Sequence, residues 1–416
     1  MECLRIIIPT LPGGDADVAA VYDGLMWSFA AREMLVPAAS HDPLERLLRV
    51  NLAYRAGEHI AIITDHEPFA APTSRLPNRL ALARRLAEAA RNISGEAVVL
   101  TYDALGPPGT EPPREVFEAV YPAGFVARLA ASGLLEPLLA KTIDTEGLAR
   151  ARTFATEAPS RIAVVLALSG RSITHTRFCS LLVRTGHTRI ATMPGIEPHM
   201  FVGVLAADWP AVARRSREVA GRLTRATGAE IRTTSDMGEN ILRFSLAGRG
   251  AFADTGFIRR PGSVGNLPGG EATIAPVEGT ATGEGLLGEG EEACLVRFEG
   301  GRLAHVIGTG AIASELARVL RELPAAAVLA ELGIGTNDKA RDASHPLEAE
   351  KILGTAHIAL GDNSGFGGAL SVPYHRDFVM HRPTLIVSYD GGTRETLIDS
   401  GRSILMDPDY DSSLNQ

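Results

Sequence analysis

The residues of this chain that are best suited to chemistry lie in two short segments of its last third. His375-Arg376-Asp377 places an imidazole and a carboxylate at alternate positions, and His357 precedes His375 by eighteen residues. Alternate residues of a strand point to the same face, so His375 and Asp377 can converge on one ion while Arg376 faces away. Two imidazoles and a carboxylate can hold a catalytic divalent metal with open coordination positions. The alternative is a structural histidine that is hydrogen-bonded to the aspartate.

His357 lies in a predicted aliphatic strand over residues 355–360, where a buried core histidine is the alternative to a ligand. The connection to His375 is short and rich in glycine. Such a connection lets the two strands lie side by side with both imidazoles on one face. The position therefore favours a ligand role for His357.

Two carboxylates extend the candidate ligand set. Glu331 follows the apolar run 325–330, where an unpaired carboxylate is costly to bury. It must therefore meet a cation or lie at a strand end in solvent. Glu271 follows the turn residues Pro268-Gly269-Gly270 at the start of a predicted strand, where loops commonly place functional groups. The alternative for Glu271 is an ordinary surface acid.

The composition restricts the class of protein. A chain of 416 residues favours two or three domains, and 45% hydrophobic residues with 43 Gly and 25 Pro suit an α/β protein. The net charge of −8, with acids and bases interspersed, argues against nucleic-acid and membrane partners. Cys3, Cys179 and Cys294 are far apart, which argues against a disulfide framework.

The N-terminal run of three isoleucines is too short for a signal peptide, and no window approaches the ~20 apolar residues of a membrane span. We therefore expect a soluble, cytoplasmic protein.

The chain divides into segments of different pattern. Residues 43–245 alternate aliphatic runs with amphipathic stretches, which predicts βα units around a mostly parallel sheet. Residues 246–416 are dense in glycine and turn pairs, which predicts a β-rich domain that carries the metal site. Residues 1–42 form an N-terminal extension or an extra strand and helix. The predicted strands are 59–64, 97–102, 161–168, 189–193, 230–234, 384–387, 396–398 and 403–405.

Three helices have clear signals. Residues 76–91 and 311–323 are amphipathic, and residues 209–226 begin after Asp208, a plausible N-cap, with Pro210 in the first turn.

The segment 168–177 passes from a predicted strand into a helix, at the edge where open parallel sheets bind ligands. The loop from Ser172 to His175 could bind a carboxylate or a peptide terminus. The alternative is a helix cap formed by Ser172 or Thr174. The glycines of 283–288 lack a strand-to-helix context, and no GxSxG elbow follows a strand, so nucleotide binding and a serine hydrolase are not indicated.

Four segments in order resemble motifs of the thermophilic metalloprotease family of aminopeptidases T and S. They are Asn266-Leu-Pro-Gly-Gly-Glu271, Glu331-Leu-Gly-Ile-Gly-Thr-Asn337, Leu347 to Gly361, and His375-Arg-Asp377. The resemblance implies an α/β domain beside a C-terminal metal-binding domain, and a homodimer. It also implies two divalent ions per chain, Zn, Co or Mn, with the ligands Glu271, Glu331, His357, His375 and Asp377.

One position departs from that family. Its characterised aminopeptidases have a metal-facing tyrosine seven residues after the strand histidine, where this chain has Ser364. Tyr374 is nearby but is not an obvious substitute.

Three hypotheses about function follow. The first is a metal-dependent aminopeptidase or related amide hydrolase, in which Glu331 is a bridging ligand or proton acceptor and the substrate is a small molecule or short peptide. The second comes from the same superfamily, which also contains 2,5-dihydroxypyridine 5,6-dioxygenase; His357, His375 and Asp377 match its Fe(II) triad in type. The third is a degenerate metallopeptidase that acts as a binding protein, which Ser364 favours.

Overall fold

The computed structural model describes residues 42–66, 79–93, 96–103, 110–170, 172–174, 176–184, 187–235, 238–364, 367–372, 374–380 and 382–405. Residues 1–41 of the predicted N-terminal extension lie outside this part. No helix within it is both long enough and apolar enough to cross a membrane.

A parallel sheet, sheet A, is built from five of the strands. They are β1 (His59–His66), β2 (Glu96–Asp103), β3 (Ile162–Ala167), β4 (Arg189–Thr192) and β8 (Val264–Asn266). Their order is β2-β1-β3-β4-β8, and every neighbouring pair is parallel. Alternate residues of β1 enter two separate cores, Ile60 and Ile62 in one and Ala61 and Ile63 in the other. Both faces of the sheet are therefore covered, which explains why its strands are aliphatic runs.

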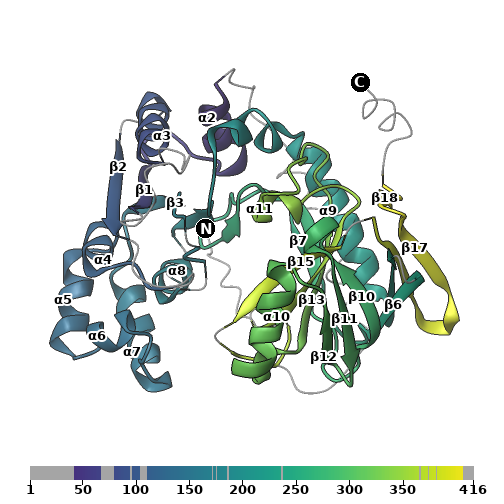
Figure 1. Cartoon of the computed structure of the whole chain (residues 1–416). Helices are drawn as coiled ribbons and strands as arrows, with labels where there is room; N and C mark the ends of the chain where they lie inside the picture. The colour runs from purple at the N-terminus through teal and green to yellow at the C-terminus, as the bar shows by residue number, and fades with distance from the viewer. Residues whose placement is uncertain are drawn as a thin grey trace. The chain divides into compact units, whose positions relative to one another are not determined.

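Helices and helical turns cover this sheet (Figure 1). They are α2 (Pro43–Arg46), η1 (Leu47–Asn51), α3 (Arg79–Ile93), α4 (Arg114–Val120), α5 (Ala123–Ala131), α6 (Leu135–Leu139), α7 (Thr145–Glu157), α8 (Arg177–Arg184), η2 (Pro198–Phe201) and η3 (Val204–Ala206). The next helix, α9 (Trp209–Arg225), packs mainly against two strands of another sheet, β7 (Phe252–Asp254) and β9 (Glu271–Ile274). The predicted helices 76–91 and 209–226 correspond to α3 and α9, although residues 76–78 lie outside the described part. The Asp208 side chain accepts a hydrogen bond from the Ala211 N–H, which confirms the predicted cap.

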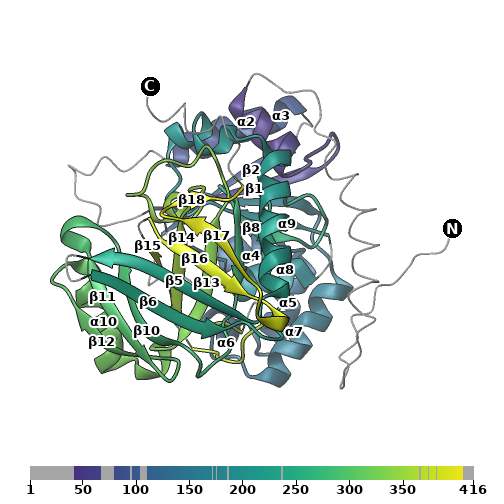
Figure 2. The same ribbon diagram turned by 90° about the vertical axis from the view of Figure 1, so that its right-hand side faces the viewer.

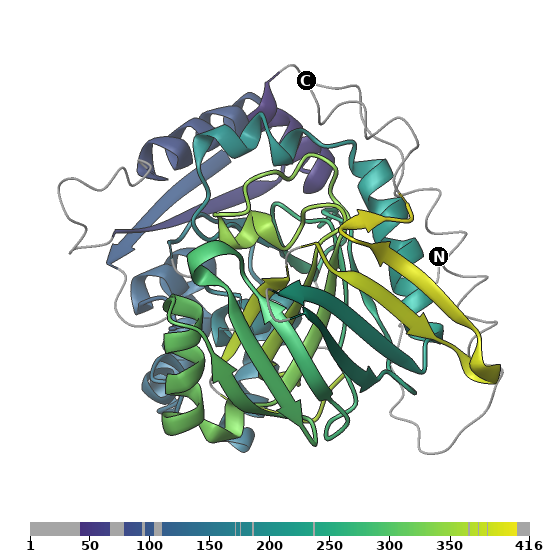
Figure 3. The same ribbon diagram turned by 45° about the vertical axis from the view of Figure 1, so that its right-hand side comes forward.

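Sheet B is antiparallel and has eight strands in the order β12-β11-β10-β6-β5-β16-β17-β18. Their bounds are β5 (Gly228–Ser235), β6 (Gly238–Ser245), β10 (Thr282–Leu287), β11 (Cys294–Glu299), β12 (Arg302–Ile307), β16 (Thr384–Ser388), β17 (Arg394–Asp399) and β18 (Arg402–Ser403). Figures 2 and 3 show β5 and β6 between the green strands β10 to β12 and the yellow strands β16 and β17.

The prediction that residues 230–234 belong to the parallel sheet is wrong. These residues lie in β5, which pairs antiparallel with β6 and β16. The connection from Ser235 to Gly238 is short, and a short connection permits antiparallel pairing only, because a parallel partner needs a crossover of about a dozen residues. The alternating pattern of this run predicts a strand but not its partner.

Sheet C is also antiparallel, with the order β15-β14-β13-β9-β7. Its strands are β7 (Phe252–Asp254), β9 (Glu271–Ile274), β13 (Leu329–Gly335), β14 (Ala356–Gly361) and β15 (His375–Met380). The remaining helices and turns are η4 (Gly290–Glu292), α10 (Ala311–Glu322), η5 (Pro324–Ala326), α11 (Pro346–Ala349) and η6 (Asp390–Gly392). One parallel sheet with helices and two antiparallel sheets confirm the predicted α/β class with a β-rich part, while the domain limits stay a prediction.

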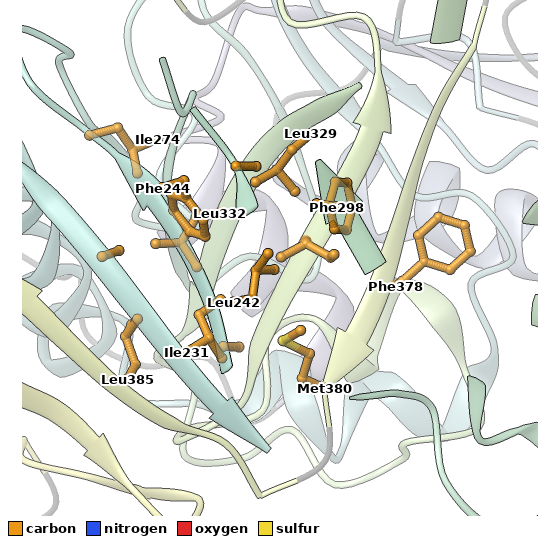
Figure 4. Close-up of a cluster of buried hydrophobic side chains, with 14 of the residues drawn as sticks. Ile231, Leu242, Phe244, Ile274, Phe298, Leu329, Leu332, Phe378, Met380 and Leu385 are labelled. Carbon is orange, nitrogen blue, oxygen red and sulfur yellow. The ribbon is translucent and has the colours of Figure 1, made fainter. Parts of the chain in front are cut away.

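Sheets B and C share one hydrophobic core (Figure 4). Sheet B contributes Ile231, Leu242 and Phe244, and sheet C contributes Ile274 and Leu332. Because side chains alternate along a strand, the residues between the core positions of sheet C lie on its opposite face. That face carries the predicted metal ligands.

Candidate metal centre

The pairing of sheet C brings all five predicted ligands to one face. Across β14 and β15, Gly361 lies opposite His375 and Ala359 lies opposite Asp377. Across β13 and β14, the same Ala359 lies opposite Glu331, and Gly333 lies opposite His357. Glu271 of β9 lies opposite Gly335. Directly opposed residues share a face of a sheet, so the acids and the imidazoles are neighbours.

Two glycines of β13 make room for this arrangement. A Cβ atom on Gly333 would lie 2.0 Å from the His357 Nε2 atom, so the imidazole lies directly over the bare strand. A Cβ atom on Gly335 would lie 2.1 Å from the carbonyl oxygen of Ile352. The Leu-Gly-Ile-Gly sequence thus alternates core side chains with positions where neighbouring groups touch the backbone.

His375 and its partners have the separations expected of metal ligands. Its Nε2 atom lies 3.3 Å from Glu331 Oε2 and 3.6 Å from Asp377 Oδ1. Two ligand atoms about 2.1 Å from one ion are about 3.0 Å apart at a right angle and about 3.4 Å apart at the tetrahedral angle. Small side-chain movements would therefore be enough to place one ion among the three residues.

His357 lies within 4.0 Å of three acids. Its Nε2 atom is 3.6 Å from Glu271 Oε2, 3.8 Å from Glu331 Oε1 and 4.0 Å from Asp377 Oδ1. Each oxygen of Glu331 therefore faces a different imidazole. This is the geometry of a carboxylate that could bridge two ligand sets.

Hydrogen bonding orients His375 for metal binding. Its Nδ1 atom lies 2.7 Å from the carbonyl oxygen of Asp362, which fixes Nδ1–H as the donor and leaves Nε2 directed at the acids. Metal-binding histidines almost always donate their second ring N–H in this way. The Glu271 Oε2 atom is buried and has no hydrogen-bond partner within the described residues, which suits a ligand of a cation.

Sequence reasoning missed three charged residues of this centre. Lys351 is fully buried, and its Nζ atom lies 2.6 Å from Glu271 Oε1 and 2.9 Å from Glu350 Oε2. Asp254 of β7 lies opposite Glu271 in the sheet and adds a third acid beside the lysine. The signal that could have found them is the Glu350-Lys351 pair just before the strand of His357, where a buried cation needs acidic partners.

The pKa values reflect an excess of buried acid. Burial lowers the pKa of both histidines, but the neighbouring carboxylates outweigh it and raise the pKa of His357 to about 9 and that of His375 to about 11. Burial raises the pKa of Glu331, yet hydrogen bonds from the two imidazoles hold that pKa well below its ordinary value. Burial also raises the pKa of Glu350 to about 7 and that of Asp254 to about 6. A positive charge in this centre is therefore strongly favoured.

The ligand atoms form two groups, each with mutual separations within 4.8 Å. One group is Glu331, His375 and Asp377, and the other is Glu271, Glu350 and His357. All five predicted ligands are joined by the direct contacts of the two imidazoles, and the second group adds Glu350 to the predicted set.

The hydroxyls of Ser364 and Tyr374 both bind acids outside the predicted ligand set. The Ser364 hydroxyl donates to Asp362 Oδ1 at 3.0 Å and is exposed. The Tyr374 hydroxyl donates to Glu315 Oε1 of α10 at 3.1 Å. Since Tyr374 precedes His375 on the chain, it points to the other side of the sheet.

The loop after β3 forms a polar network at the carboxyl end of sheet A. The Thr174 hydroxyl lies 2.8 Å from the hydroxyls of Ser172 and Thr192, and Thr192 donates to Asn266 Oδ1 at 2.5 Å. The helix cap comes from Thr176, which accepts from the Cys179 N–H at 3.2 Å, so Ser172 and Thr174 do not serve as the predicted cap. His175 lies outside the described residues.

Comparison with known proteins identifies solved structures with a similar fold. No family model matches the chain. No curated protein matches it. The structure of 2,5-dihydroxypyridine dioxygenase from Pseudomonas putida KT2440 is similar, with 17% identity, 92% of this chain and 99% of that chain covered, and a TM-score of 0.60. Wild-type AmpT (aminopeptidase T) from Thermus thermophilus is similar with 20% identity, 87% and 99% coverage, and a TM-score of 0.53.

These two structures share the fold of this chain over nearly their whole length. The fold that the sequence resemblance implied is therefore confirmed. At these identities the likeness extends to the fold and no further, so the activity must be argued from the site.

Proposed function

We propose that the chain is a metal-dependent amide hydrolase that acts on a small molecule or a short peptide. The observation that carries the proposal is Glu331, a buried carboxylate whose two oxygens face the Nε2 atoms of His357 and His375. Asp377 and Glu271 lie on the same face, so the site offers three carboxylates and two imidazoles. This is more carboxylate than a site of two imidazoles and one acid has. Such mixed oxygen and nitrogen donors suit Zn, Co or Mn.

The proposed ligands are Glu331, His357, His375, Asp377 and the Oε2 atom of Glu271. A divalent ion held there would acidify a bound water and polarise a carbonyl group. Both oxygens of Glu331 face imidazoles, which supports its role as a ligand more than its role as a proton acceptor. The side chains of His375 and Asp377 are 21% and 25% exposed, so the substrate would reach the centre from their side.

A second candidate function has its own support. The ammonium of Lys351 is bound to Glu271 and Glu350, so these two acids are already paired, and His357, His375 and Asp377 supply two imidazoles and one acid next to Glu331. That set is the facial triad of non-haem Fe(II) oxygenases. Ser364 in place of a metal-facing tyrosine is a further departure from the aminopeptidases that the sequence resembles.

Metal content and two assays separate the candidates. Protein purified without chelator is analysed for Zn, Co, Mn and Fe, and it is then assayed for hydrolysis of aminoacyl p-nitroanilides and dipeptides with each ion. In parallel, oxygen consumption is measured with Fe(II) and 2,5-dihydroxypyridine. Amide hydrolysis that needs the ion supports the proposal, oxygen uptake without hydrolysis supports the second candidate, and protein that binds no ion refutes both.

The homodimer that the resemblance implies is part of this proposal. Sedimentation equilibrium of the full chain measures it directly. A mass of one chain at micromolar concentration would contradict it.

A further inference from the structure

Phe252 is an exposed aromatic residue on the face of sheet C that carries the predicted ligands. It begins β7, the edge strand of that sheet, and its side chain is 66% exposed. Among the described residues with large, exposed hydrophobic side chains, it alone is aromatic. It lies outside the four segments that carry the family resemblance, and the proposed function gives it no role.

The strand register places Phe252 in one row with His357. Phe252 of β7 lies opposite Thr273 of β9, and Thr273 lies opposite Gly333 of β13. On its other side, Gly333 lies opposite His357 of β14. Directly opposed residues share a face, and the next residue of β7, Ala253, packs against the core on the other face. Phe252 therefore lies on the same side of the sheet as the imidazoles and acids.

The distance along this row suits a small substrate. Neighbouring strands are about 4.8 Å apart, so the backbone of Phe252 lies about 10 Å from that of Gly333. The imidazole of His357 lies over Gly333, since a Cβ atom there would be 2.0 Å from its Nε2 atom. Half-buried Thr273 lies between them in the row. A substrate whose carbonyl group is at the ion can therefore extend a side chain over Thr273 to the ring of Phe252.

The rows on both sides of this one contain acids. Asp254 lies opposite Glu271 in one of them, and in the other Glu331 and Asp377 lie on either side of Ala359. Ligand sites combine a few such polar groups with apolar surface that contacts the rest of the ligand. A single exposed hydrophobic residue needs no explanation by itself, but an exposed aromatic ring on an edge strand favours association with other chains. Binding of a substrate explains why it lies beside a charged centre.

From this placement we infer that Phe252 forms a subsite for an apolar side chain of the substrate, next to the metal centre. The inference deepens the proposed function and rests on it in requiring that an ion is bound at this face. It selects substrates in which the residue at the cleaved amide has an aliphatic or aromatic side chain. Burial of about two methylene groups against the ring is enough for a tenfold gain in affinity.

Two hydroxamates that differ only in their side chain test the subsite. The full chain loaded with Co(II) is titrated by calorimetry with glycine hydroxamate and with leucine hydroxamate, which offer the same oxygens to the ion. Wild type should bind leucine hydroxamate at least about tenfold more tightly, and in Phe252→Ala this ratio should fall below about threefold. Phe252→Leu keeps an apolar side chain and should keep most of the preference.

Ile307→Ala is the matched control. Ile307 is 59% exposed and lies on β12, the edge strand of sheet B, so its loss removes a similar exposed side chain away from the metal face. This variant should keep the wild-type ratio. Phe252→Ala should also keep the wild-type affinity for Co(II), because Phe252 contacts the substrate and not the ion.

Four results would overturn the inference. They are a wild-type ratio near one, an unchanged ratio in Phe252→Ala, loss of Co(II) affinity in that variant, or its conversion from dimer to monomer in sedimentation equilibrium, which would assign Phe252 to a subunit contact. The test also separates the subsite from the reaction. A preference for leucine hydroxamate that depends on Phe252, without amide hydrolysis, would support the subsite and refute the hydrolase. Amide hydrolysis without the preference would do the reverse, and wild type that binds no Co(II) would refute both.

Discussion

Replacing Gly333 with alanine tests whether His357 is held over bare backbone for the purpose of binding an ion. The added Cβ would lie 2.0 Å from His357 Nε2 and 2.1 Å from its Cε1 atom. Ordinary van der Waals contact begins at 3.4 Å, so the ring must retreat by about 1.4 Å. Metal–ligand distances tolerate only about 0.2 Å, so His357 could not remain a ligand.

The expected cost divides into two measurable parts. Overpacking at a buried position costs about 1–3 kcal/mol of unfolding free energy. Loss of one imidazole ligand should weaken divalent-metal binding at least about 100-fold, which corresponds to about 2.8 kcal/mol. Urea denaturation of the metal-free chain measures the first, and calorimetric titration with Zn(II) or Co(II) measures the second.

Gly124 provides the matched control, because a Cβ atom there meets nothing within 4 Å. Gly124 is the second residue of α5, so alanine there should leave metal affinity unchanged and raise stability by less than the ~0.5–1 kcal/mol found in the middle of a helix. A folded Gly333→Ala variant that binds metal as tightly as Gly124→Ala would refute the reasoning about His357.

Three further substitutions have defined outcomes. Glu331→Gln should reduce metal affinity about 100-fold or more in the same titration, because it removes the acid shared by both imidazoles; an unchanged affinity would exclude Glu331 as a ligand. Leu332→Ala should lower the unfolding free energy by about 2–5 kcal/mol in urea, since Leu332 is fully buried between sheets B and C, and a loss below 1 kcal/mol would contradict that packing. Burial of Glu230 opposes its ionisation, yet hydrogen bonds from three arginine side chains lower its pKa from 4.5 to about 2. The ionised Glu230 therefore contributes fully to the unfolding free energy above pH 4.5, and this contribution is lost as the pH falls towards 2. The difference in unfolding free energy between wild type and Glu230→Gln should shrink over that pH range. A constant difference would be inconsistent with the ion pairs.

Local patterns predicted four strands of sheet A, the paired strands β14 and β15, and the three helices α3, α9 and α10, because these signals are short-range. The spacing of His375 and Asp377 predicts one face of a strand, and the glycine-rich connection from His357 predicts an adjacent strand; β14 and β15 pair as expected. The cap at Asp208 is equally local. Each of these features depends on residues that are close in the chain.

Other features depend on partners that are distant in sequence. Glu350 is adjacent to Lys351 in the sequence, but the other two acids, Asp254 and Glu271, come from β7 and β9, and the sequence around the lysine does not indicate which distant strands supply them. The prediction that β5 belongs to the parallel sheet was wrong for a related reason, because the pattern of a strand does not indicate which strand it pairs with. The network of Thr174, Thr192 and Asn266 likewise joins the ends of separate strands.

Strand β13 serves the core and the metal centre with alternate residues. Leu332 and Ile334 pack between the sheets, while Glu331, Gly333 and Gly335 belong to the other face. Deleting or inserting one residue here would exchange the two sets and place a carboxylate among hydrophobic side chains. In evolutionary and engineering terms, this strand can change by substitution but not by length, so any variation in the size of the centre must come from the loops that flank it.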